Sequence, residues 1–298
     1  MKKLIWILII LIFGLTCAYG ASGGNAVFDF LKLDTNARAA AIGGTFVGIS
    51  DDVNALAYNP AGLGNIEVNQ ITFMHNQWFE GVRQQYIGFV HRKGFGIGID
   101  YLDYGKIQRT TIKEPKGSGL DRFSSYDIAL LVGYGKRLKD TLSLGLNLKY
   151  IAEKIYKYNA WAVAVDGGIL YKIPSINLDL GLNIQNIGTN VEFKNRREEL
   201  PQNVKFGLCY RFNNKKGLIA IDLNKQLNGL YSFNLGTEYS IVKFLTLRAG
   251  LNGRNKTDSG LVAGFGINYS EFVLDYAVSP YGELGLTHRI SISKRFGR

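Results

Sequence analysis

Residues 142–150 read Leu-Ser-Leu-Gly-Leu-Asn-Leu-Lys-Tyr, a stretch in which every second side chain is apolar. Side chains on a β-strand point to alternate faces, so this stretch predicts a strand with one apolar face and one face of small or polar residues. The segments 176–184 and 245–252 repeat the same alternation. A strand with this pattern separates an apolar environment from a wet one.

The alternation recurs from residue 66 to the end of the chain, in segments of roughly ten residues separated by turns. The abundance of glycine (36), tyrosine (17) and phenylalanine (17) beside only five prolines favours an all-β protein. Fourteen strands are predicted, an even number that allows an up-and-down antiparallel barrel to close. Their ranges are 66–75, 83–92, 94–104, 123–135, 141–153, 159–172, 175–188, 201–212, 216–225, 230–240, 243–252, 258–269, 271–279 and 283–296.

The predicted connections fall into two classes that alternate along the chain. Longer ones, such as 105–122 and 189–200, follow odd-numbered strands, whereas tight turns such as Lys93 and Ser270 follow even-numbered strands. Long loops on one side and short turns on the other are typical of a bacterial outer-membrane barrel with both termini in the periplasm. We therefore expect an integral outer-membrane protein in contact with lipid at residues 66–298. A soluble β-sandwich also alternates and remains the alternative.

The first twenty residues have the layout of a secretory signal peptide. Lys2 and Lys3 precede an apolar run over 4–15, and Gly20 provides a small residue for cleavage. The run is about half of the ~20 residues that a membrane-spanning helix needs, which disfavours a retained anchor. A lipoprotein modified at Cys17 is a second alternative.

Charge and residue usage predict neither an enzyme nor a nucleic-acid-binding protein. The formal charge is +11, but the basic residues are spread over candidate turns, and export separates the chain from nucleic acid. His75, His91 and His288 lie on separate predicted strands without ligand spacing. Only Cys209 remains after cleavage, which excludes an intramolecular disulfide. No catalytic residue, metal site or cofactor is predicted.

Residues 21–65 do not alternate and predict two short helices instead. Asp34 or Thr35 is a candidate cap for a helix over 37–42, which Gly43 and Gly44 end. A second helix is expected from the candidate cap Ser50, with Asp51 and Asp52 at its N-terminus, up to Asn59 before Pro60. Fourteen strands enclose more space than their own side chains fill. We predict that 21–65 is a plug inside the barrel, and a periplasmic tail is the alternative.

Glycines on the polar face of the strands are expected to make room for this plug, because glycine lets another backbone approach closely. The candidate lumen-facing positions are Gly94, Gly96, Gly98, Gly133, Gly135, Gly264 and Gly266.

The stretch FLKLDTNARAAAIGGTFVGISDDVNALAYNPAGLGNI, residues 30–66, resembles the N-terminal signature of the PorV/PorQ family, a branch of the FadL-type fatty-acid transporters. The closing stretch LGLTHRISISKRF, residues 284–296, is similar to the last strand of that family. The resemblance implies a fourteen-stranded barrel with a hatch, whose plug motif here is Asn59, Pro60, Ala61, Gly62 and Leu63.

The same resemblance implies two roles. FadL relatives import hydrophobic molecules such as fatty acids, so a channel for uptake of a hydrophobic small-molecule ligand is the first expectation. PorV serves type IX secretion, so the alternative is a non-enzymatic component of a type IX-like secretion system that binds exported proteins and other secretion-system proteins through 105–122 and 189–200.

Overall fold

The computed structural model describes residues 27–193, 196–227, 229–255 and 257–297, so the predicted signal peptide at 1–20 lies outside the described residues. Fourteen strands form one closed antiparallel barrel in which β1 pairs with β16 and β7 with β10. The strands are β1 (Asn69–Gln77), β2 (Arg83–Val90), β3 (Phe95–Gln108), β4 (Arg122–Lys139), β5 (Leu142–Ile155), β6 (Tyr158–Ile173), β7 (Leu178–Gly188), β10 (Asn203–Phe212), β11 (Gly217–Gln226), β12 (Tyr231–Val242), β13 (Leu245–Asn252), β14 (Leu261–Tyr269), β15 (Phe272–Pro280) and β16 (Leu286–Phe296). The predicted fold class is confirmed.

Several strand boundaries differ from the prediction: β3 and β4 run on to Gln108 and Lys139, and two strands begin later because a turn precedes them. The strand expected at 258–269 begins at Leu261, after Gly260 with a φ of +74°. The strand expected at 283–296 begins at Leu286, because 282–284 forms a 3₁₀ turn. The connection 189–202 contains an unpredicted pair, β8 (Val191–Phe193) and β9 (Arg196–Glu198).

The two faces of the barrel are those that the alternation predicts. On β5, Leu146 and Leu148 are 63% and 53% exposed, whereas Ser143 and Asn147 are each 2% exposed and face the interior. Aromatic pairs lie on the sheet near both ends. Examples are Phe95 with Tyr134, Phe89 with Phe296, and Tyr150 with Trp161. An apolar outer wall between aromatic rows is typical of a membrane barrel.

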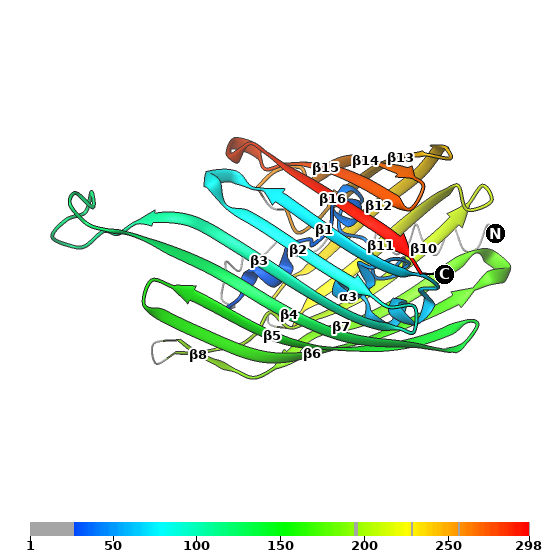
Figure 1. Ribbon diagram of the computed structural model, residues 1–298, viewed down its shortest axis with the longest axis horizontal. Helices are drawn as coiled ribbons and strands as arrows, with labels where there is room; N and C mark the ends of the chain where they lie inside the picture. Colours follow the sequence, from blue (N-terminus) through cyan, green and yellow to red (C-terminus); the bar gives the residue numbers. More distant parts are fainter. Residues whose placement is uncertain (1–26, 194–195, 228, 256, 298) are drawn as a thin grey trace.

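The connections are sorted by length between the two ends of the barrel (Figure 1). The connections 109–121, 189–202 and 253–260 belong to one end, from which the β3–β4 hairpin projects furthest. Turns such as 140–141 and 243–244 belong to the other end, where β16 finishes. One connection after an odd strand, 156–157, is a two-residue turn rather than a longer loop.

Residues 27–66, here called the N-terminal segment, lie inside the barrel (Figure 1). The segment contains η1 (Asp29–Lys32), α2 (Ala37–Ala41), α3 (Ala55–Tyr58) and η2 (Pro60–Asn65). In the part of the chain that the structure describes, no helix is long and apolar enough to cross a membrane.

Candidate functional site: the barrel interior

The helices of the N-terminal segment begin at different residues from those predicted. Asn36 caps α2, because its side-chain oxygen accepts a hydrogen bond from the Arg38 backbone N–H at 2.7 Å. Asp34 and Thr35 are therefore not caps. Ser50 donates to the Phe46 carbonyl at 2.8 Å instead of capping, and the second helix begins only at Ala55. The predicted end at Asn59 is correct.

The Asn59-Pro60 turn is held to the barrel wall by side-chain hydrogen bonds. Asn59 donates to the carbonyls of Val47 at 2.9 Å and Ile169 at 3.1 Å, and its side-chain oxygen accepts from the Ala61 N–H at 3.2 Å. Pro60 occupies the first turn of η2, where its missing N–H costs nothing. The five residues of the motif, Asn59, Pro60, Ala61, Gly62 and Leu63, are all buried.

Glycine contacts show where the segment touches the wall. A Cβ added at Gly98 would lie 3.0 Å from Leu56 of the segment, and Gly96 faces the same leucine. A Cβ at Gly264 would lie 2.6 Å from that of Ala41. Both contacts place the segment against the wall with no room for a larger side chain.

Further glycines of the predicted set behave in the same way, with two exceptions. Gly133 and Gly135 also face the segment. Gly266 makes room for the side chains of Arg248 and Asp275 rather than for the segment. Gly94 does not receive the segment at all. It lies in the β2–β3 turn with a φ of +88°, against the carbonyl of Gly135, so turn geometry explains it.

Several glycines that the sequence reasoning missed are in closer contact with the segment. A Cβ at Gly145 would overlap the Pro60 carbonyl, and one at Gly236 would overlap the carbonyl of Ile42. Both stand on the polar face of an alternating strand, and that position is the signal that could have found them. Others with this property are Gly168, Gly181, Gly207 and Gly250.

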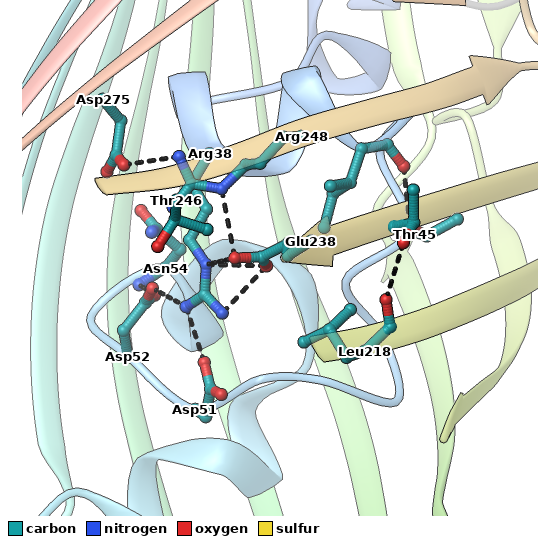
Figure 2. Close-up of polar contacts among 12 residues, drawn as sticks. Arg38, Thr45, Asp51, Asp52, Asn54, Leu218, Glu238, Thr246, Arg248 and Asp275 are labelled. Atoms are coloured by element: carbon teal, nitrogen blue, oxygen red, sulfur yellow. Dashed lines mark hydrogen bonds and ion pairs between the residues drawn. The ribbon is translucent and has the colours of Figure 1, made fainter. Parts of the chain in front are cut away.

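Arg38 joins the segment to the wall through three carboxylates (Figure 2). Its guanidinium lies 2.7 Å from Asp51, 2.6 Å from Asp52 and 3.0 Å from Glu238 on β12. Burial by itself would lower the pKa of Arg38, but the charges of Asp51 and Glu238 raise this pKa well above its ordinary value. Asp51 and Asp52 are thus ion-pair partners of Arg38, and Asp52 also accepts a hydrogen bond at 2.9 Å from the N–H of Asn54, the residue before α3.

The ionic cluster continues along the wall. Arg248 on β13 bonds Glu238 at 3.1 Å and Asp275 on β15 at 2.7 Å (Figure 2). Arg211 on β10 reaches Asp51 at 3.2 Å. A cavity of about 280 Å³ borders this cluster at the short-turn end of the barrel. Arg211 also pairs with Asp179 on β7 at 3.2 Å, so one connected network links the segment to five strands.

Asp34 forms a second polar junction nearer the long-loop end. It accepts hydrogen bonds from Tyr58 at 3.1 Å and from Arg254 at 2.8 Å. Burial would raise the pKa of Asp34, yet the charges of Arg254 and Arg289 keep it below its ordinary value of 3.8. Asp34 therefore stays ionised at neutral pH.

An apolar cluster lies inside the barrel against β3 to β6, beside buried charged residues such as Asp100 and Lys149. Phe28 and Phe30 of the segment, 2% and 3% exposed, pack in one cluster with leucine, isoleucine and alanine side chains of the wall. At this level the wall contributes four alanines, Ala129, Ala160, Ala162 and Ala164, beside larger side chains such as Leu102, Leu131 and Ile151. The rings of the segment and the larger wall side chains fill this space together.

The three histidines lie apart, but His91 is not on a strand as predicted, because β2 ends at Val90. His75 is on β1, His91 in the β2–β3 turn and His288 on β16. Within the described ranges, no three His, Cys, Asp or Glu side chains are placed to hold a metal ion.

Comparison with known proteins identifies the fold class. Residues 18–155 match the model of an uncharacterised protein family, UPF0164. No curated protein sequence matches the chain. Among solved structures, the CymD monoaromatic hydrocarbon channel has 13% identity and a TM-score of 0.65, over 91% of this chain and 100% of that chain. The ΔS2 mutant of the TodX monoaromatic hydrocarbon channel has 16% identity and a TM-score of 0.61, over 91% of this chain and 100% of that chain.

The crystal structure of the Pseudomonas putida toluene transporter TodX is also similar, with 15% identity and a TM-score of 0.52, over 87% of this chain and 96% of that chain. The chain thus has the fold of the FadL-type outer-membrane channels. The narrower resemblance to the PorV/PorQ family stays a prediction.

Proposed function

We propose that this chain is an outer-membrane channel for the uptake of small hydrophobic molecules, and that its N-terminal segment is the plug that closes it. The support is the fold shared with hydrocarbon channels, together with an apolar outer wall that would contact lipid. In this proposal the short turns and both termini face the periplasm, and the long loops face outward. No catalytic step is needed.

The observation that carries the proposal is the apolar compartment around Phe28 and Phe30. Four of the wall residues at this level are alanines, so side chains of the segment, with Phe28 and Phe30 among them, fill space that the wall leaves. Displacement of the segment would leave a space lined by apolar groups. Such a lining suits a hydrophobic solute rather than a hydrated ion.

The test is a disulfide crosslink that holds the segment against the wall and that a reductant can break. Ala41 of α2 packs against Ala277 of β15, and both are buried. The double variant Ala41→Cys/Ala277→Cys, with Cys209→Ser to remove the native thiol, would be expressed in cells whose uptake of toluene is followed. We expect uptake above the empty-vector level under reducing conditions and loss of that excess upon oxidation.

The single variant Ala277→Cys in the same background is the matched control, because it cannot form the crosslink. If the crosslink forms and toluene uptake is unchanged, the segment is not the gate. A gap in the barrel wall would then be the remaining route into the periplasm. Uptake no greater than with empty vector under any condition would refute the channel itself.

A second function, binding of secretion-system proteins, is favoured by one observation. The connection 109–121 projects beyond the barrel and carries Ile112, whose side chain is fully exposed. Deletion of 110–120 separates the two functions. Retained toluene uptake together with impaired surface delivery of type IX cargo would support the second, and unchanged cargo delivery would remove it.

A further inference from the structure

A cavity of about 310 Å³ lies at the long-loop end of the interior, between the segment and the wall. Its volume is at the lower end of ordinary small-molecule sites. The residues that decide its chemistry are Leu33, Trp78, Tyr231, Arg254, Tyr281 and Arg289. The carboxylate of Asp34 and polar side chains such as Asn252 and Asn255 also line the cavity, so apolar and aromatic groups share it with two arginines.

Arg289 is a buried cation that makes no direct contact with a carboxylate of the described residues, although its charge lowers the pKa of Asp34. It lies on β16, is 3% exposed and forms no hydrogen bond or ion pair with any residue that the structure describes. Its Nε is shielded from solvent and unbonded. Arg248, equally buried, has two carboxylate partners, so an unpaired arginine is not the rule in this barrel. Burial of an unpaired charge is costly, and an anionic ligand would remove that cost.

Trp78 supplies a second unbonded donor to the same cavity. Its indole N–H is buried and has no partner among the described residues. The ring itself is fixed by contacts with Phe79 at 4.8 Å and Tyr281 at 5.9 Å between centroids. A fixed indole offers both an apolar face and one hydrogen-bond donor.

The cavity's own carboxylate does not satisfy these donors. Asp34 is engaged by Arg254 and by the hydroxyl of Tyr58. Arg254 is further bonded to the carbonyl of Lys32 at 2.7 Å. The cavity thus offers two free donors, one of them charged, beside an aromatic surface.

We propose that this cavity binds a small hydrophobic monocarboxylate. The carboxylate oxygens would accept hydrogen bonds from the Arg289 guanidinium and the Trp78 N–H, and the apolar body would lie against Trp78, Tyr281 and Leu33. This assignment rests on the proposed channel function and narrows its solutes to anions with a compact apolar body. A neutral hydrocarbon leaves both donors unpaired and binds more weakly.

The experiment is isothermal titration of the detergent-solubilised full chain with benzoate and with benzamide, which has a similar shape but no charge. A charge-assisted hydrogen bond predicts benzoate binding about tenfold or more tighter than benzamide binding. Arg289→Gln is expected to remove this preference, and Arg289→Lys to keep part of it. Arg83→Gln is the matched control, because Arg83 lies at the same end on β2, is half-exposed and pairs with Asp103.

Trp78→Phe keeps the ring and removes the N–H, so it tests the second donor even if Arg289→Gln does not fold. Weaker benzoate binding with unchanged benzamide binding supports the assignment. Equal affinity for the two ligands in the wild type, or unchanged benzoate affinity in both Trp78→Phe and Arg289→Lys, overturns it. Toluene uptake by cells is measured separately, so a channel that admits toluene but shows no benzoate preference refutes the carboxylate site alone.

Discussion

Replacement of Arg38 by methionine should release the N-terminal segment from the wall. The side chain of Arg38 is 14% exposed and lies within 3.0 Å of three carboxylates. Glu238 keeps Arg248, and Asp51 keeps Arg211, but Asp52 loses its ion-pair partner. Because removal of one partner leaves a buried charge uncompensated, we expect a loss of about 3 kcal/mol, the low end of the range for buried pairs.

Cys209 reports this loss without an added reporter residue. Its side chain is fully buried on β10 and packs in one cluster with Ala39, Ile42 and Phe46 of the segment. A maleimide reaches the thiol only when the segment moves away, so the labelling rate follows the open population. A loss of about 3 kcal/mol corresponds to labelling faster by roughly a hundredfold. Cys17→Ser leaves Cys209 as the sole thiol of the chain.

Two further variants sharpen the measurement. Arg38→Met combined with Asp52→Asn removes the uncompensated charge and should label more slowly than Arg38→Met alone. Arg83→Met breaks an exposed ion pair with Asp103 and should leave the rate unchanged. Labelling of Arg38→Met at the wild-type rate, or no rescue by Asp52→Asn, would show that the ionic cluster does not hold the segment.

Three other predictions concern the same docking, each read out by Cys209 labelling. Gly145→Ala should weaken it by about 2 kcal/mol or more, since the new Cβ overlaps the segment's backbone, whereas Gly167→Ala should be tolerated because the nearest atom is 3.8 Å away; equal effects would contradict the contact. Asn59→Leu loses three hydrogen bonds and leaves buried carbonyls unpaired, so it should weaken docking by about 1–3 kcal/mol. Labelling at the wild-type rate would show that the Asn59 side chain does not hold the segment. The contribution of Asp34 to docking should be present at neutral pH and be lost as the pH falls below 3.8, because neighbouring arginines depress the pKa of Asp34 in the folded state; the labelling rate is divided by that of the unfolded chain at the same pH, and an equal pH profile of the wild type and Asp34→Asn below 3.8 would oppose that account.

The barrel could be predicted because its signal is local. The alternation of Leu146 and Asn147 is set by the two-residue repeat of a strand, and the structure places the first outward and the second inward. The sorting of connections by length follows from the same segments. The ends of the strands cannot be predicted in the same way. Residues that fit the alternation can belong to a turn instead, as those of 282–284 do.

The interior could be predicted only in outline. Arg38 and Glu238 are 200 residues apart, and no local pattern pairs them. Asn36, Asp34 and Thr35 are all suitable helix caps by residue type, and the structure uses Asn36. Asp34 is instead hydrogen-bonded to Tyr58 and Arg254, which are distant in sequence. The interior glycines carried a readable signal, their place on the polar face, but the turn at Gly94 gives the same residue type for another reason.

The seam between β1 and β16 has a consequence for biogenesis. It pairs Asn69 with Phe296, so the sheet cannot be sealed until the last strand of the chain has been delivered. The N-terminal segment precedes β1 in sequence and touches strands on both sides of the seam, through Gly145 and Gly264. The N-terminal segment therefore precedes every strand that later surrounds it. Shortening this segment should hinder closure of the barrel as well as its gating.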